Sequence, residues 1–285
     1  MLDSTKLKLT TLSENTVGSG LVGAEWGLSI LIETEERKIL LDTGGGTTAF
    51  HNASSLGVDL RSVDTIVLSH GHFDHTAGLN TILPMIEGKV PVIAHPDVWN
   101  LEYALNKKKN TYRFIGIPHR REYLEALGAE FELSTGPQQI TADIKTSGEE
   151  PMSTDFEQLP DYLYKSIEGK YVSDSIADDL SLYIRTDLGL VIVLGCAHRG
   201  VINIIRHAQQ LMDTEKVYMV VGGTHLISAS EERIDRTISA LRDIDVTWLG
   251  VSHCTGAPAS AKLASAFPGG FFTNNAGNVI KFPYE

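Results

Sequence analysis

The chain has 285 residues, 42% of them hydrophobic and 21% charged, which is the composition of a folded globular protein. Its net charge of -12 argues against a nucleic-acid-binding protein, because phosphate binding depends mainly on clustered Lys and Arg. The two cysteines are too few for a disulfide framework, and the sequence shows neither a membrane-spanning apolar run nor a secretory signal pattern, so we expect a cytoplasmic protein.

The first half of the chain alternates short apolar runs with one helical pattern. Residues 29–34 and 38–42 are apolar runs joined by a charged connection, which predicts a β-hairpin. Residues 63–69 and 89–94 predict two further strands, and residues 76–86 between them have helical spacing. The order is therefore strand, loop, helix, strand.

The second half repeats this theme. Strands are expected at residues 181–185, 190–194, 217–221, 246–251, 271–272 and 279–282. Helices are expected at residues 201–212, 231–242 and 259–266. A hairpin followed by alternating strands and helices in each half predicts an α/β fold in which two sheets pack face to face with helices outside. We expect residues 1–285 to form a single domain.

Residues 100–180 have a weak pattern with many turn residues and charges. A structureless loop of that length is improbable in a compact domain. We interpret the segment as an insertion that covers the active site, with helix expected near residues 97–105 and 121–127.

Four potential metal ligands follow directly on the buried apolar run 65–69. They are His70, His72, Asp74 and His75. His70 and His72 project to the same side of an extended segment, whereas the turn into the next helix can direct Asp74 and His75 toward a second point. Imidazole and carboxylate groups suit zinc, with iron or manganese as alternatives. The structural alternative is that these side chains cap the helix or lie on a solvated loop.

Three later histidines stand in similar surroundings. His198, His225 and His253 each come shortly after an apolar run expected to be a strand. Taken singly, each would more often be a structural histidine. As a set with the first cluster, they predict a binuclear metal site at the carboxyl ends of the strands, where open α/β folds place their ligands.

These residues resemble the metallo-β-lactamase superfamily from about residue 25 to residue 285. The shared features are Asp42 after the second strand of the hairpin, the His-x-His-x-Asp-His run and the later histidines at strand ends. Three segments resemble more narrowly the branch of 7,8-dihydropterin-6-yl-methyl-4-(β-D-ribofuranosyl)aminobenzene 5'-phosphate synthases. They are GCAHRG at 195–200, GGTHL at 222–226 and HCTG at 253–256.

The resemblance implies a four-layer αβ/βα sandwich with two mixed sheets and outer helices, together with two divalent cations. The implied ligands are His70, His72 and His198 for the first cation and Asp74, His75 and His253 for the second. Most of the superfamily supplies a bridging Asp between the last two motifs, but this chain has Gly223-Thr224-His225 there. His225 is then either a ligand or an acid/base facing the substrate. Asp42 is implied to be a buried acceptor that holds the motif loop, with an ordinary turn residue as the alternative.

The implied chemistry is hydrolysis of a phosphorylated or pterin-like small molecule by a water activated between the cations. Asp74 would orient the hydroxide and His225 would protonate the leaving group. The alternative is a synthase that displaces pyrophosphate from a pterin. A di-iron oxidoreductase is less well supported, because such relatives carry Glu where this chain has His72. A nuclease conflicts with the net acidity, and a non-catalytic binding module conflicts with the intact ligand set.

Candidate substrate-binding residues lie outside the metal motifs. Trp26 stands where relatives often carry His and offers a stacking surface, although a core position is equally compatible. Lys108 and Arg113 belong to a basic stretch that could bind a phosphate tail or be a solvated charge run. Cys196 and Cys254 receive no catalytic role, since burial is the common fate of a free cysteine. We expect a small-molecule substrate and neither a nucleic-acid nor a membrane partner; the oligomeric state stays open, with a homodimer as one option.

Overall fold

A computed structural model describes residues 1–18 and 20–285, and its strands form two large sheets and one small sheet. The first large sheet has the order β18-β1-β2-β3-β4-β5-β8. Its strands are β1 (Lys8–Ser13), β2 (Ser29–Glu33), β3 (Lys38–Leu41), β4 (Thr65–Val67), β5 (Val90–Ala94), β8 (Ala129–Leu133) and β18 (Val279–Lys281). The second has the order β17-β16-β15-β14-β13-β10-β9. Its strands are β9 (Gln139–Thr141), β10 (Ile144–Thr146), β13 (Ser181–Thr186), β14 (Gly189–Leu194), β15 (Val217–Gly223), β16 (Trp248–Ser252) and β17 (Phe271–Thr273).

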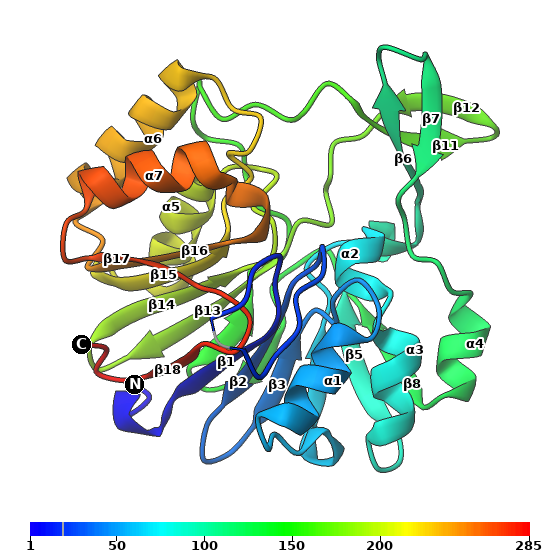
Figure 1. The fold of residues 1–285 in the computed structure, drawn as a ribbon, viewed down its shortest axis with the longest axis horizontal. Helices are drawn as coiled ribbons and strands as arrows, with labels where there is room; N and C mark the ends of the chain where they lie inside the picture. Colours follow the sequence, from blue (N-terminus) through cyan, green and yellow to red (C-terminus); the bar gives the residue numbers. More distant parts are fainter. Residues whose placement is uncertain (19) are drawn as a thin grey trace.

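The helices cover the outer faces of these sheets (Figure 1). The α-helices are α1 (Thr48–Ser55), α2 (Phe73–Thr76), α3 (Leu79–Ile82), α4 (Arg121–Ala126), α5 (Val201–Met212), α6 (Glu231–Ile244) and α7 (Ala257–Ala266). Short 3-10 turns occur at η1 (Ser4–Lys6), η2 (Leu60–Ser62), η3 (Leu83–Met85), η4 (Pro96–Trp99) and η5 (His253–Thr255). Among the described residues, we find no helix whose length and apolar character would let it cross a membrane.

The alternation of side chains along each central strand explains the layers. In β14, Ile192 faces the core under α5–α7, whereas its neighbours Val191 and Val193 face the core between the sheets. In β3, Leu40 faces the core under α1 and α3, while Ile39 packs between the sheets. Both large sheets are thus buried on two faces, which confirms the expected αβ/βα sandwich with mixed sheets.

The expected hairpin is confirmed by the antiparallel pairing of β2 with β3. The expected helix at residues 76–86 is interrupted, and α3 and η3 are short separate pieces. At Gly78 the backbone approaches so closely that a Cβ would clash with the Thr43 carbonyl oxygen at 2.0 Å, and Pro84 follows within η3. Strand β1, which the sequence pattern did not predict, pairs with both β2 and β18.

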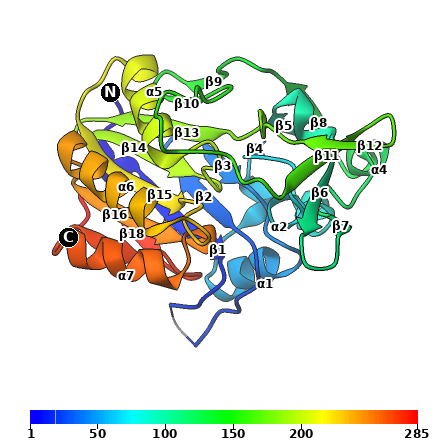
Figure 2. The same ribbon diagram turned by 90° about the horizontal axis from the view of Figure 1, so that it is seen from above.

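Residues 100–180 contribute to all three sheets. The expected helix at 97–105 is wrong, because η4 ends at Trp99 and β6 follows, whereas α4 confirms the helix expected near 121–127. Strands β8, β9 and β10 extend the large sheets. A separate four-stranded sheet has the order β12-β11-β6-β7, with β6 (Leu101–Asn106), β7 (Thr111–Phe114), β11 (Leu163–Ile167) and β12 (Lys170–Ser173). Figures 1 and 2 show this small sheet on the side of the molecule opposite α6 and α7.

Candidate metal centre

The predicted ligands gather where parallel strands end. Strands β3 and β4 run parallel, and so do β14, β15 and β16, so that their carboxyl ends lie together within each sheet. Four residues just beyond these ends have left-handed backbone conformations, with φ between 47° and 58°; they are Asp42, Ala197, His225 and His253. Such conformations are costly for residues other than glycine, and they concentrate at functional sites. Here they belong to the segments that carry the candidate ligands.

The first cluster consists of His70, His72 and His198, which are all buried. His70 Nε2 lies 3.0 Å from His72 Nδ1 and 3.2 Å from His198 Nε2. Nitrogen atoms bound to one tetrahedral zinc are separated by about 3.3 Å, which follows from a Zn–N bond of about 2.0 to 2.1 Å. The three ring nitrogens therefore have the spacing of a common metal ligand set.

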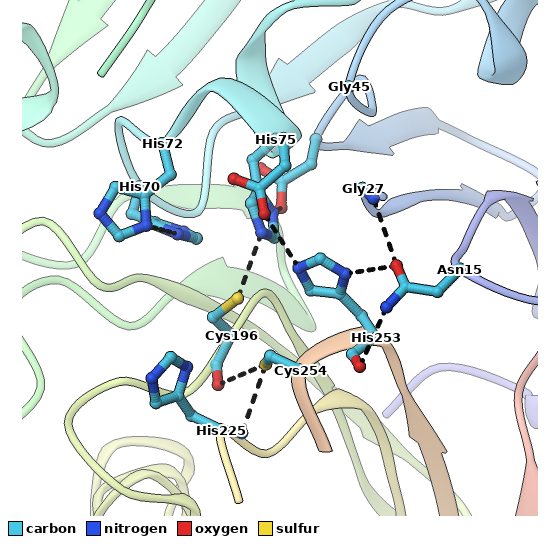
Figure 3. Close-up of polar contacts among 12 residues, drawn as sticks. Asn15, Gly27, Gly45, His70, His72, His75, Cys196, His225, His253 and Cys254 are labelled. Atoms are coloured by element: carbon cyan, nitrogen blue, oxygen red, sulfur yellow. Dashed lines mark hydrogen bonds and ion pairs between the residues drawn. The ribbon is translucent and has the colours of Figure 1, made fainter. Parts of the chain in front are cut away.

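The second cluster consists of Asp74, His75 and His253. Asp74 Oδ2 lies 3.3 Å from His253 Nε2, which has no hydrogen-bond partner among residues 1–18 and 20–285. The Cys196 thiol lies 3.2 Å from His75 Nε2, and both belong with His253 to a group whose potential donor atoms lie within 4.8 Å of one another. Figure 3 shows the side chains of His75, Cys196 and His253 directed toward a common region. Both clusters fit metal ions: the ring nitrogens of the first have the spacing of a ligand set, and the buried His253 Nε2 of the second needs another partner.

Two residues orient the histidines of the second cluster. Asp42 Oδ2 lies 2.6 Å from His75 Nδ1, and Asn15 Oδ1 lies 2.8 Å from His253 Nδ1. Each acceptor places the ring proton on Nδ1 and leaves the lone pair of Nε2 directed at the cluster. Asp42 also accepts hydrogen bonds from the backbone amide and the hydroxyl of Ser69 at 2.7 Å each. Asp42 therefore lies against the loop that carries the His-x-His-x-Asp-His run, as the sequence resemblance implied. The sequence pattern gave no signal for Asn15.

The electrostatics of the clusters differ. Burial and the neighbouring imidazoles lower the pKa values of His70 and His198 well below 6.5, and burial lowers the pKa of His72 to about 3. These rings are therefore neutral near pH 7, as metal ligands must be. Burial would also lower the pKa of His75, but the Asp42 carboxylate raises it to about 9. A cation at His75 consequently competes with a proton.

The carboxylate of Asp74 is ionised at neutral pH. Burial would raise its pKa, but the His253 ring, whose Nε2 lies 3.3 Å away, and the charge of His75 hold the pKa below the usual range. An ionised, nearly buried carboxylate beside imidazole nitrogens is a suitable metal ligand.

Buried acidic residues outside the motif support its loop. Asp178 Oδ2 accepts a hydrogen bond from the Gly71 amide at 2.8 Å, and burial raises the pKa of Asp178 to about 7. Glu102 on β6 lies with its Oε2 3.8 Å from His72 Nε2, and neither atom has a hydrogen-bond partner within the described part of the chain. The sequence pattern missed both acids; the adjacent Asp178-Asp179 before the expected strand at 181–185 was the available signal.

A cavity of about 130 Å³ opens beside the clusters, and its wall includes Tyr162, His225, Trp26 and Arg113. His225 Nε2 lies 3.4 Å from the Tyr162 hydroxyl oxygen, and the His225 ring is 4.1 Å from that of His198 between centroids. Trp26 is 50% exposed and also borders a neighbouring cavity of about 420 Å³. Arg113 is exposed on β7, whereas Lys108 lies in the exposed connection between β6 and β7, outside the lining of the cavity.

Residues 23–135 match the family model described as metallo-beta-lactamase superfamily. The chain is 35% identical over 287 aligned positions to the 7,8-dihydropterin-6-methyl-4-(beta-D-ribofuranosyl)-aminobenzene-5'-phosphate synthase of Methanocaldococcus jannaschii, with 97% of each chain covered. It is also 33% identical to an uncharacterized protein of the same archaeon, covering 90% of this chain and 93% of the relative.

The fold matches a solved structure as well. The crystal structure of Tm1679, described as a metal-dependent hydrolase of the beta-lactamase superfamily, superposes with a TM-score of 0.81 and 24% sequence identity. The match covers 96% of this chain and 98% of the other. At this identity the similarity concerns the fold alone.

Proposed function

Because the chain belongs to the metallo-beta-lactamase superfamily of metal-dependent enzymes, we propose that it uses its metal centre for a synthase reaction. The reaction joins a dihydropterin-6-methyl unit to the amino group of ribofuranosylaminobenzene 5'-phosphate and displaces pyrophosphate. The observation that carries this proposal is the full-length similarity to a synthase named for that product. Hydrolysis, the first expectation from the sequence, matches the description of Tm1679, but that structure is 24% identical and shows the fold alone.

The bond changes define what the site must do. The amine nitrogen forms a bond to the pterin methylene carbon, and the bond from that carbon to the pyrophosphate oxygen breaks. The electron pair leaves with pyrophosphate, and the amine gives up one proton. Two bound divalent cations would neutralise the negative charge that develops on the leaving group.

The ligands are assigned from their clusters. We assign His70, His72 and His198 to one cation and Asp74, His75 and His253 to the other. The expected metal is zinc, with iron and manganese as alternatives. Asp42 and Asn15 keep the second set of rings in the tautomer that binds metal.

We assign proton transfer to His225. Its Nε2 lies beside the Tyr162 hydroxyl on the cavity wall, where it can accept the amine proton after the new bond forms. An imidazole suits this role because it exchanges protons near neutral pH. Its left-handed backbone, with φ of 47°, holds the ring at the end of β15.

Two residues on the rim are assigned to substrate binding. The half-exposed Trp26 ring borders both cavities and offers a flat face for the pterin. Arg113 lines the smaller cavity near the Phe73 ring and offers a guanidinium for the acceptor's 5'-phosphate. Lys108 is not carried into this assignment, because it does not line the cavity.

A two-substrate assay tests the proposal. Zinc-loaded protein is incubated with 6-hydroxymethyl-7,8-dihydropterin pyrophosphate, with and without the amine, while pyrophosphate release and product mass are measured. We expect release that requires the amine and yields the coupled product. Release at the same rate without the amine would make the protein a hydrolase. The His225→Ala variant, with unchanged metal content, is expected to lose most of the turnover, and full turnover would refute the role of His225.

A further inference from the structure

We propose that the Cys196 thiolate is a metal ligand that bridges the two cation positions. The inference rests on the proposed binuclear site and gives a role to a cysteine that the sequence left without one. Three groups of potential donors occur among the described residues, and Cys196 belongs to every one of them. One contains His70 and His198 of the first cluster, and another contains His75 and His253 of the second.

The position of the sulfur favours a bridge. In Figure 3 the Cys196 side chain extends from its strand end toward the predicted ligands, and its sulfur lies 3.2 Å from His75 Nε2. Ala197, with a φ of 54°, is the left-handed residue between Cys196 and His198. This turn allows the side chains on both sides of Ala197 to reach the metal centre from one short segment.

The end of β15 leaves this bridging role open. Gly223 stands in the stretch where the sequence resemblance expects a bridging Asp, and it has no side chain. A Cβ at Gly223 would lie 2.5 Å from the Gly195 carbonyl oxygen and 2.7 Å from Cys254 Sγ. The local packing therefore excludes a carboxylate at Gly223.

Charge balance calls for an anionic bridge. The first cluster offers three imidazole rings, which bind metal as neutral groups, and the second offers a single carboxylate, that of Asp74. Two divalent cations in a buried site need further negative charge. A thiolate at the junction supplies it, and binding displaces the thiol proton to solvent. A sulfur ligand would also favour zinc over manganese, which prefers oxygen ligands.

Cys254 provides a matched control. Its sulfur accepts a hydrogen bond from the His225 amide at 3.3 Å, and its thiol donates to the Cys196 carbonyl at 3.4 Å. It is as buried as Cys196, and each is 3% exposed. Cys254 also belongs with Cys196 and His225 to the third donor group. Cys254→Ser therefore tests both the general effect of losing a buried sulfur and whether Cys254 supplies a sulfur ligand.

X-ray absorption at the zinc edge tests the proposal in the zinc-loaded protein. We expect a sulfur shell at about 2.3 Å in the wild type and in Cys254→Ser, and only nitrogen and oxygen at about 2.0 to 2.2 Å in Cys196→Ser. A bridging sulfur contributes to both ions, so it gives about one sulfur per zinc, against about one half for a terminal ligand. Cobalt-substituted protein gives a second readout, since only a thiolate ligand produces a sulfur-to-cobalt charge-transfer band.

The outcomes separate this inference from the proposed reaction. A wild-type protein without a sulfur shell overturns the bridge even if synthase activity is present, and so does a shell lost in Cys254→Ser but kept in Cys196→Ser. A wild-type count near one half overturns the bridging geometry. A full sulfur shell in a protein without synthase activity supports the bridge and leaves the reaction refuted. The wild-type spectrum decides the matter if Cys196→Ser does not fold.

Discussion

The substitution Asp42→Asn tests how the fold prepares a metal ligand. Asn tolerates the left-handed conformation of Asp42, which has a φ of 58°, so the backbone at the end of β3 can stay in place. The carboxylate accepts from the Ser69 amide and hydroxyl and from His75 Nδ1 at 2.6 to 2.7 Å. An amide cannot accept at both oxygen positions. If its NH2 faces His75, the ring must carry its proton on Nε2 and loses the lone pair that would bind metal.

The expected magnitude follows from these contacts. Loss of an outer hydrogen-bond acceptor typically weakens metal binding by about 10- to 100-fold, which corresponds to about 1.4 to 2.7 kcal/mol. Breaking the buried pair with His75 is expected to lower the stability of the metal-free protein by about 3 to 5 kcal/mol.

Chelator competition and urea unfolding measure the two effects separately. We expect weaker binding of one cation, while the site of His70, His72 and His198 keeps its affinity. Asp64→Asn is the matched control, because Asp64 accepts from the Lys38 amide at 2.8 Å away from the metal centre. If Asp42→Asn binds two cations as tightly as the wild type, Asp42 does not set the His75 tautomer and the reasoning fails.

Three further predictions concern the surroundings of the site. Glu102→Gln is expected to weaken cation binding at the first cluster by about tenfold in chelator competition, because Glu102 faces His72 Nε2. Glu132 is exposed, so Glu132→Gln is the control and should leave the affinity unchanged. Equal cation affinities of the two variants would contradict a role for Glu102 in orienting His72. The folded pKa of Asp178, about 7, lies above its ordinary 3.8, so its contribution to stability is present below pH 3.8 and is lost as the pH rises toward 7. In urea unfolding of metal-free protein, Asp178→Asn should therefore gain on the wild type by up to about 1.4 kcal/mol per pH unit between pH 5 and 7, and a pH-independent difference would refute this. Arg113→Ala is expected to raise the KM for the phosphorylated acceptor about tenfold with kcat nearly unchanged. Lys108→Ala, the control, should leave both constants unchanged. Equal effects of the two substitutions would reject the assignment of Arg113 to the acceptor phosphate.

The sequence predicted the parts of the fold that are buried on both faces. Strands such as β14 and β15 are continuous apolar runs because helices cover one face of their sheet and the other sheet covers the second. The candidate histidines were recognisable for the same reason, since each follows such a run. Their convergence required only that parallel strands end on one side of the sheet.

The small sheet was not predictable by the same reasoning. Every residue of β7 and β12 is exposed except one in β7 that is half-buried. These strands therefore lack the alternation of apolar and polar residues that a covered face would impose. Their aromatic contacts, such as Tyr112 stacked on Tyr171 at 3.8 Å between ring centroids, join strands about 60 positions apart in the sequence. Glu102 was missed because β6 was expected to be helical, which obscured its approach to His72.

The local strain at the strand ends links the fold to its chemistry. A left-handed conformation costs a residue other than glycine about 1 to 3 kcal/mol, and Asp42, Ala197, His225 and His253 all adopt it. Hydrogen bonds fix part of this geometry, as Glu14 does by accepting from the His253 amide at 2.6 Å. Cations bound by the surrounding side chains would offset the remainder, because they bind the folded chain in preference to the unfolded one. The left-handed residues thus bring the candidate ligands together, and the hydrogen bonds and bound cations in turn would stabilise those strained conformations.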